Sequence, residues 1–364
     1  MRELTMIRRR SVSVAACAAS AMLLGVTGCT DIPPGVIEPQ AKTDIFAYAT
    51  STELIVADGT TTVSRTPGAF DTTRDVGLTK DAKFAFWKED SRNGDGPVVA
   101  AVSTGAHATA IRVPCGCRQV LPFSGSTIVW LQAPGTVMRM DLAAAQPKPA
   151  VWRTITPAPQ AQQHIDILAI EQDRLLLNRY DIEQQYDSIK SQLFTIEANG
   201  ETRTRGPLSD IKAYFYSGAF SPDGQSAALS QYAVPSSYVR DMACSQAVIY
   251  FLDLTTDALR PTVPAPENCS SALKLRWDTP DGPTIAVDRW PAFSAPAGAQ
   301  TTRWQRRQGT WSPLDPPIAD RAKTWAGATI ELAKPGSADY YDVYFIKNDQ
   351  RTRIAEQVYS IAVP

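Results

Sequence analysis

The feature that most constrains this chain is a short turn unit that recurs between apolar runs. It is clearest in Phe220–Leu229 and again in Trp277–Val287, where Pro-Asp-Gly separates two runs of apolar residues. Proline presets φ, aspartate bonds nearby backbone, and glycine supplies a positive φ, so this tripeptide favours a tight turn between antiparallel strands. Weaker copies occupy Leu78–Phe86 and Phe123–Trp130. The pattern predicts an all-β fold.

The spacing of these units predicts a repeated sheet. We expect the strand that follows each turn to begin near residues 44, 83, 126, 174, 225, 284 and 328. Successive starts are then roughly 40 to 60 residues apart, which is enough chain for four short strands in each repeat. The alternative is a pair of β-sandwiches, which also consist of short strands and turns.

The two clearest units carry a family resemblance. Phe220-Ser221-Pro222-Asp223-Gly224 and the Trp277–Gly282 segment resemble the repeat of TolB-like, or WD40-like, β-propellers, in which such a turn joins the first two strands of each blade. The resemblance implies a seven-bladed β-propeller over residues 44–364. Six blades are the alternative, because the first repeat is the least regular.

The two ends of the predicted domain complement each other. Only three strands can be assigned before the second repeat, at Asp44–Thr50, Glu53–Val56 and Thr60–Arg65, while Val358–Val363 is left over at the C-terminus. We expect this last strand to complete the first blade from the inside, because such pairing removes an exposed sheet edge.

The N-terminus has the pattern of an export signal. Arg2 and Arg8 to Arg10 precede the uncharged stretch Ser11–Gly28, which is too short and too rich in small residues for a spanning helix. Leu24–Thr30 resembles the lipobox of bacterial lipoproteins. The resemblance implies a signal peptide over residues 1–28, diacylglyceryl transfer to the Cys29 thiol and acylation of the new amine. Several acyl chains give stable anchoring at about 0.8 kcal/mol per buried methylene.

The segment after Cys29 predicts a tether. Residues 30–40 contain three prolines and no helical period, so we expect residues 29–43 to be the lipidated cysteine and an extended linker. The expected location is extracytoplasmic, attached to the bacterial cell membrane through the lipid.

Four cysteines remain in the mature chain, at Cys115, Cys117, Cys244 and Cys269. An even number in an exported protein predicts two disulfides, with three possible connectivities. In a propeller the first two cysteines lie across the ring from the other two, and a disulfide needs Cα atoms within about 7 Å. We therefore predict the pairs Cys244–Cys269 and Cys115–Cys117.

Composition and motifs give no sign of a reaction. Thirty-six basic and 37 acidic residues leave a net charge of −1, so nucleic-acid binding is not expected. His107 and His164 are the only histidines and fit no metal-ligand spacing. Hydrolase, P-loop and dinucleotide-binding signatures are absent as well. We expect no metal, no cofactor and no catalytic residue, and ligand-binding residues stay unassigned.

Aromatic and basic residues are dense late in the chain. They are Trp290, Arg303, Trp304, Arg306, Arg307, Trp311 and Trp325. One interpretation is a sugar- or peptide-binding platform based on stacking and cation–π contacts. The interpretation we favour is strand packing, in which arginine stems cover the tryptophans.

Together these features predict a lipid-anchored extracytoplasmic propeller. TolB-like proteins work with partner proteins in envelope processes, so the resemblance implies a protein-binding or scaffold module that binds partners in the cell envelope. The alternatives are a propeller-type hydrolase or lactonase, with carboxylates or a metal at the central channel, and a sugar-binding sensor, with aromatic residues there. Fold alone does not decide among them.

Overall fold

The computed structural model of the chain describes most residues from Thr43 to Pro364. The described residues are 43–70, 76–89, 96–105, 109–132, 135–156, 163–171, 173–181, 190–206, 214–232, 246–266, 269–277, 280–290, 300–314, 318–335 and 340–364. They all belong to one compact unit, residues 42–364. This unit contains every described sheet and apolar cluster, so it has a core of its own.

Every regular element in the described residues is a β-strand. The first part of the chain forms β1 (Ile45–Thr50), β2 (Glu53–Asp58), β3 (Thr61–Pro67), β4 (Val76–Leu78), β5 (Phe84–Glu89), β6 (Val98–Ser103), β7 (Ile111–Pro114), β8 (Cys117–Pro122), β9 (Thr127–Gln132), β10 (Thr136–Asp141) and β11 (Ala150–Thr154). The middle forms β12 (Gln163–Glu171), β13 (Arg174–Asp181), β14 (Lys190–Ile196), β15 (Thr202–Arg205), β16 (Tyr214–Phe220), β17 (Ser226–Tyr232), β18 (Val248–Asp253) and β19 (Leu259–Thr262). The last part forms β20 (Cys269–Arg276), β21 (Thr284–Trp290), β22 (Gln300–Arg307), β23 (Thr310–Pro313), β24 (Asp320–Lys323), β25 (Thr329–Ala333), β26 (Tyr341–Lys347) and β27 (Gln350–Ala362). In these residues we find no helix that is long and apolar enough to span a membrane.

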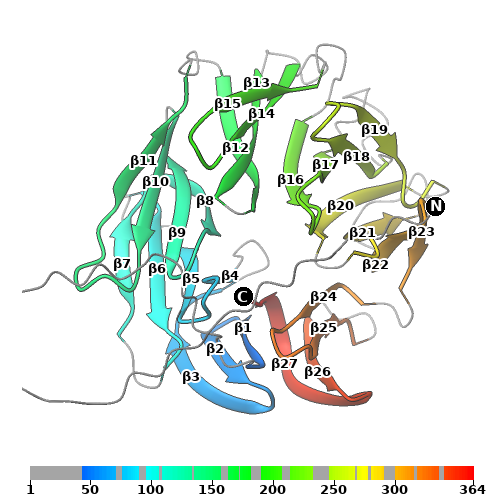
Figure 1. Cartoon of the computed structure of the whole chain (residues 1–364). Helices are drawn as coiled ribbons and strands as arrows, with labels where there is room; N and C mark the ends of the chain where they lie inside the picture. The colour runs from blue at the N-terminus through cyan, green and yellow to red at the C-terminus, as the bar shows by residue number, and fades with distance from the viewer. Residues whose placement is uncertain are drawn as a thin grey trace, which may run out of the picture. The chain divides into compact units, whose positions relative to one another are not determined.

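The strands form antiparallel sheets that follow one another in chain order. Five sheets have four strands each, β4–β7, β8–β11, β12–β15, β16–β19 and β20–β23, and one has seven, in the order β24-β25-β26-β27-β1-β2-β3. Figure 1 shows the sheets of this unit arranged around a common centre, with the first strand of each four-stranded sheet nearest to it. No sheet closes on itself. Radial repetition of small antiparallel sheets is the architecture of a β-propeller, as the sequence predicted.

The predicted strand starts agree with the structure to within one residue. The strands after the turns begin at Ile45, Phe84, Thr127, Arg174, Ser226, Thr284 and Thr329. The Pro-Asp-Gly turn explains the accuracy at β17. The amide of Gly224, at φ +66°, donates to the Ser221 carbonyl, and the Asp223 carboxylate accepts from the Ser221 hydroxyl at 2.6 Å.

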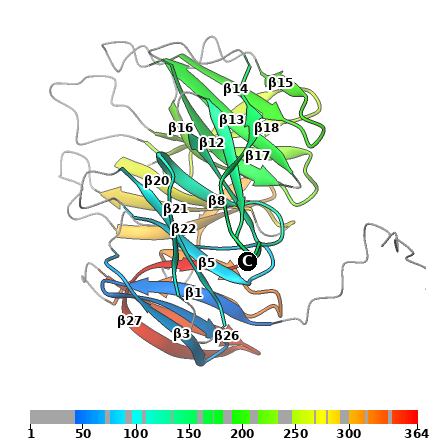
Figure 2. The ribbon, with the colours of Figure 1, turned by 90° about the vertical axis from the view of Figure 1, so that its left-hand side faces the viewer.

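Strand β27 joins the two ends of the unit, as predicted. It pairs with β26 between Gln350 and Val358 and with β1 between Val358 and Ala362, so Val358 has a partner on both sides. Next to Val358, Gln357 has a φ of +57°, an irregularity in the strand at the point where its pairing with β1 begins. Figure 2 shows β27, in red, lying beside β1, in blue.

Apolar cores fill most junctions between successive sheets. One cluster lies between β1–β2 and the β4–β7 sheet, one inside the seven-stranded sheet, and four between successive four-stranded sheets. The described residues place no apolar cluster at the junction of the β20–β23 sheet with β24. Buried charges join the sheets there: the Asp320 carboxylate lies 2.9 Å from Arg303 Nη1 and 3.0 Å from Arg276 Nη2.

Candidate functional site

Arg118 lies near the start of β8, directly after a disulfide-bonded turn. Cys115 and Cys117 are joined, with Cα atoms 5.0 Å apart, and both are buried. Gly116 between them has a φ of +55°, a conformation that glycine adopts at little cost. The turn therefore fixes the backbone that carries Arg118, whose side chain is 66% exposed.

Strand β12 places two polar side chains next to this arginine. His164 and Asp166 are two residues apart on the strand, so their side chains lie on the same face of the sheet. Arg118 Nη2 lies 3.2 Å from His164 Nδ1, and Arg118 Nη1 lies 3.9 Å from Asp166 Oδ1. Because a guanidinium only donates, this contact requires Nδ1 of His164 to be the unprotonated nitrogen.

Two tyrosines from further strands complete the group. Arg118 Nη1 donates to Tyr180 Oη at 3.3 Å, and Tyr214 Oη donates to Asp166 Oδ2 at 2.9 Å. The Tyr180 ring stacks on His164 with centroids 5.5 Å apart and contacts the Tyr214 ring at 4.6 Å. Burial, followed by the charge of Asp166, raises the pKa of both tyrosines. Both phenols therefore keep their protons at neutral pH.

A pocket of about 120 Å³ opens beside this group. Its lining is Gly116, Arg118, Gln119, Leu131, Gln163, His164, Ile165, Asp166 and Ile167. Buried Ile165 and Ile167 supply an apolar surface, while the exposed Arg118 supplies charge at the edge. We call Arg118, His164, Asp166, Tyr180 and Tyr214 with this pocket the Arg118 site. Its chemistry suits recognition of a small polar or anionic group next to an apolar one.

The Asp320 cluster at the polar junction groups three cations around one buried carboxylate. Arg276, Arg303 and Lys274 all contact the single carboxylate of Asp320, with Lys274 Nζ at 3.6 Å. Burial opposes ionisation of Asp320, but the charges of Arg276, Arg303 and Lys274 outweigh it and lower its pKa. Asp320 is therefore ionised at neutral pH and is held by the surrounding cations.

A second, larger pocket of about 340 Å³ lies at this polar junction. Its lining is Asp281, Gly282, Thr284, Gln305, Arg307, Leu314, Arg321, Ala322, Lys323, Thr329, Glu331 and Ile346. Buried Glu331 accepts from Arg321 Nε at 2.9 Å and from Arg351 Nε at 3.3 Å. The pocket includes Lys323, at the end of β24, and Thr284, at the start of β21. The Arg118 site lies near the starts of the inner strands β8 and β12, so the two pockets are at opposite ends of the inner strands. We call this second pocket the basic pocket.

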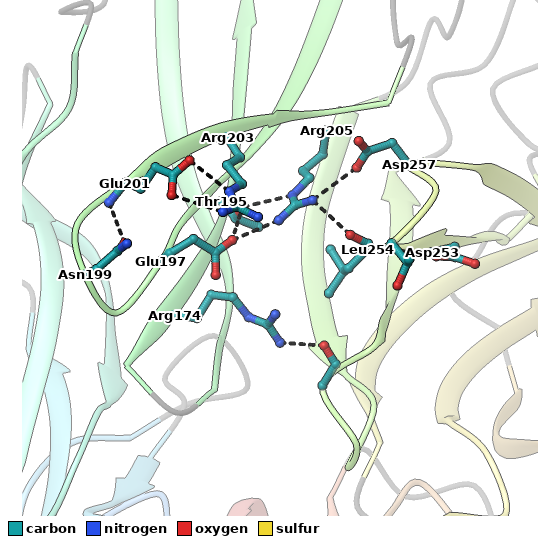
Figure 3. A network of polar contacts seen from close by, with 12 residues as sticks. Arg174, Thr195, Glu197, Asn199, Glu201, Arg203, Arg205, Asp253, Leu254 and Asp257 are labelled. Atoms are coloured by element: carbon teal, nitrogen blue, oxygen red, sulfur yellow. Dashed lines mark hydrogen bonds and ion pairs between the residues drawn. The ribbon is translucent and has the colours of Figure 1, made fainter.

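A third polar group is structural and is drawn in Figure 3. Arg205 on β15 is 7% exposed, and its guanidinium donates to Thr195 Oγ1, Glu197 Oε1, the Leu254 carbonyl and Asp257 Oδ1 at 2.8 to 3.3 Å. These contacts tie the β12–β15 sheet to the β16–β19 sheet. We call this the Arg205 network, and it leaves little of the guanidinium for a ligand.

The predicted cysteine sites have different outcomes. The Cys115–Cys117 disulfide is present, at the edge of the Arg118 site. Cys269 is disulfide-bonded, but Cys244 lies outside the described residues, so its pairing with Cys269 stays a prediction. Cys29 and His107 also lie outside the described residues.

The aromatic and basic residues late in the chain pack between strands, in line with the interpretation we favoured. Arg306 lies over the Phe251 ring at 4.2 Å, and Arg289 lies over Trp304 at 5.3 Å. Trp311 Nε1 donates to Thr262 Oγ1 at 2.9 Å. Arg303 differs, because it is fully buried in the Asp320 cluster, and Arg307 lines the basic pocket.

Sequence reasoning assigned no residue of the Arg118 site to binding. His164 fits no metal-ligand spacing in the sequence, and Arg118 belongs to no motif. The one sequence signal near the site is Gly116 between two cysteines, directly before Arg118. In the part of the chain that the structure describes, no three His, Cys, Asp or Glu side chains are grouped so that they could hold a metal ion.

Comparison with known proteins gives matches among solved structures alone. No family model and no curated protein matches the sequence. Prolyl oligopeptidase B from Galerina marginata is 9% identical with a TM-score of 0.51, and the match covers 88% of this chain and 51% of that one. The β-propeller domain of the Trilobed protease from Pyrococcus furiosus is 10% identical with a TM-score of 0.49, covering 85% and 93%.

A protein described as TolB from Agrobacterium tumefaciens is also similar. It is 13% identical with a TM-score of 0.37, and the match covers 86% of this chain and 89% of that one. The chain spans about half the length of the Galerina peptidase. At such low identities a structural match concerns the fold and not the activity. What the comparisons add is therefore that the arrangement of these sheets occurs in other proteins.

Proposed function

We propose that this protein is a lipid-anchored β-propeller of the bacterial cell envelope that binds a partner protein through the Arg118 site. The proposal counts seven blades, with the seven-stranded sheet divided at Gln357 into two blades that share β27. The basic and apolar pattern of residues 1–28 and the lipobox-like sequence before Cys29 support the anchor.

The observation that carries the binding role is the exposed guanidinium of Arg118. Three successive sheets contribute to the site, through β8, β12 with β13, and β16. Residues that are far apart in the sequence thus place one cation and several donors beside an apolar pocket. An arginine next to aromatic rings is the kind of group that dominates binding at protein interfaces.

The ring stack of the site favours a second candidate, a sugar-binding sensor. Tyr180 and Tyr214 contact each other at 4.6 Å, and His164 stacks on Tyr180. Stacked aromatic surfaces with nearby hydroxyl donors also suit carbohydrate rings. A thermal-shift screen of sugars separates the candidates, since a sugar that raises the melting temperature of the unmodified chain but not of Tyr214→Phe favours the sensor.

The binding role is tested by crosslinking in whole envelopes. The unmodified protein, Arg118→Ala and the matched control Arg112→Ala are each crosslinked, purified and analysed by mass spectrometry. Arg112 is 50% exposed on β7 and pairs with Glu89, outside the site. We expect one protein to be recovered with the unmodified chain and the control but not with Arg118→Ala. Equal recovery with both variants contradicts the proposal.

The anchor is tested separately. Cells that express the unmodified chain or Cys29→Ser are fed a palmitate analogue, and incorporation into the protein is measured. We expect labelling and membrane fractionation of the unmodified chain alone. Labelling of Cys29→Ser contradicts this part of the proposal.

A further inference from the structure

The basic pocket has more positive charge than its carboxylates can neutralise. Arg307, Arg321 and Lys323 line it, against Asp281 and Glu331. Glu331 already contacts two arginines, Arg321 and Arg351. Arg307 and Lys323 are exposed, and no ion pair holds either of them within the described residues. Two cations with exposed charged groups therefore face the pocket.

A buried arginine lies directly behind the lining. Thr284 lines the pocket and accepts hydrogen bonds from Arg303 at 2.7 and 3.0 Å. Arg303 belongs to the Asp320 cluster, where several cations share one carboxylate. Low-dielectric walls focus the field of such groups into the nearby cavity. The whole chain, by contrast, carries a net charge of only −1, so the positive charge is local.

The chain enters the compact unit beside this pocket. The Asp44 carboxylate accepts from Thr324 Oγ1 and from Lys347 Nζ, both at 2.6 Å. Both partners of Asp44 are next to residues that line the pocket: Thr324 follows Lys323, and Lys347 follows Ile346. A tether that runs from Cys29 to Thr43 would therefore meet the folded unit within a few residues of the pocket.

We propose that the basic pocket binds a phosphate group and that, in the anchored protein, this group is the headgroup of an anionic lipid. Arginine and lysine side chains are the usual donors to phosphate oxygens. Each basic residue near an anionic membrane surface contributes about one kcal/mol to binding, which corresponds to about fivefold in affinity. The lipid assignment rests on the proposed anchor, whereas the phosphate site rests on the described residues alone.

The test uses residues 30–364, which lack Cys29 and contain the whole compact unit. Binding is measured by sedimentation with vesicles of phosphatidylcholine and with vesicles of equal parts phosphatidylcholine and phosphatidylglycerol. Calorimetry with inorganic phosphate measures the free anion. The variant Arg307→Gln with Lys323→Gln removes the two exposed cations of the pocket. Its matched control, Arg139→Gln with Lys148→Gln, removes one exposed arginine and one exposed lysine that do not line the pocket.

We expect binding to the phosphatidylglycerol vesicles and a loss of about 30-fold in the pocket variant, with the control unchanged. Binding of inorganic phosphate without binding to vesicles, again lost in the pocket variant, assigns the site to a free phosphate compound. No binding of either probe, or equal losses in the two double variants, overturns the proposal. Because this chain lacks the lipid, such a failure leaves the tests of Cys29 and Arg118 unaffected.

Discussion

Arg205 and Arg118 both contact neighbouring sheets, but they differ in how much of the guanidinium the protein uses. Arg205 is 7% exposed and donates to four residues at 2.8 to 3.3 Å (Figure 3). Arg118 is 66% exposed, and its contacts with His164, Tyr180 and Asp166 are 3.2 to 3.9 Å long. A buried, fully bonded arginine joins sheets, whereas an exposed, loosely bonded one is available to a ligand.

The largest loss of stability is expected at Asp320, the buried carboxylate that contacts three cations. Asp320→Asn leaves Arg276, Arg303 and Lys274 around a neutral side chain, so we expect a loss of about 3–5 kcal/mol in the free energy of unfolding, measured in urea. Arg276→Gln retains two cations beside the carboxylate and serves as the milder comparison. A loss below about 1 kcal/mol in Asp320→Asn, the range of exposed ion pairs, contradicts the assignment of a buried, charge-bearing junction.

The same residue predicts a dependence on pH. The pKa of Asp320 is lower in the folded chain than in the unfolded chain, because its cations outweigh its burial. Its contribution to stability is therefore complete above about pH 4, the unfolded pKa, and is lost as the pH falls through the lower folded value. Urea titrations between neutral and acid pH should show a smaller acid loss in Asp320→Asn than in the unmodified chain. Equal acid losses would contradict the lowered pKa.

Removal of Arg205 comes next in size. Arg205→Ala leaves Glu197 and the Leu254 carbonyl without their partner, and we expect a loss of about 2–4 kcal/mol in the free energy of unfolding. The measurement is again urea unfolding of the purified compact unit. A loss equal to that of Arg118→Ala would remove the distinction between the two arginines.

Two glycines differ in how much space the structure leaves for a side chain. A Cβ on Gly282, which lines the basic pocket at φ +126°, would lie 2.1 Å from the Arg306 backbone oxygen. A Cβ on Gly224 would meet only the end of the Arg174 side chain, at 2.9 Å. We expect Gly282→Ala to lower the free energy of unfolding by about 2–3 kcal/mol and Gly224→Ala to lower it by about 1 kcal/mol, both measured in urea. A larger loss in Gly224→Ala than in Gly282→Ala would contradict the close approach of Gly282 to the Arg306 backbone.

The smallest effect on stability is expected at Arg118. Because its side chain is mostly exposed and its contacts are long, Arg118→Ala should change the free energy of unfolding by less than about 0.5 kcal/mol. Partner recovery should nevertheless be lost. Destabilisation comparable to that of Arg205→Ala would indicate that Arg118 serves the fold.

The turn units of the sequence marked where β5, β9, β17 and β21 begin, because a Pro-Asp-Gly or related turn acts over a few residues. The partner of the C-terminal strand could be predicted too, since Val358–Val363 had no other place in the repeat. The Arg118 site could not, because Arg118, Asp166 and Tyr214 meet through three sheets. Their register includes shifts after Cys117 and after Ile167 that no local sequence signal marks.

The most direct test of the binding role is a crosslink from the site itself. A photo-crosslinking amino acid is placed at Gln119, an exposed residue that lines the pocket of the Arg118 site, and at Thr202, which is also exposed, on β15 as control. After irradiation of living cells, we predict an adduct of one defined mass from Gln119 that is lost in Arg118→Ala and is not formed from Thr202. No adduct from Gln119, or the same adduct from both positions, would contradict the assignment of this site as the binding surface.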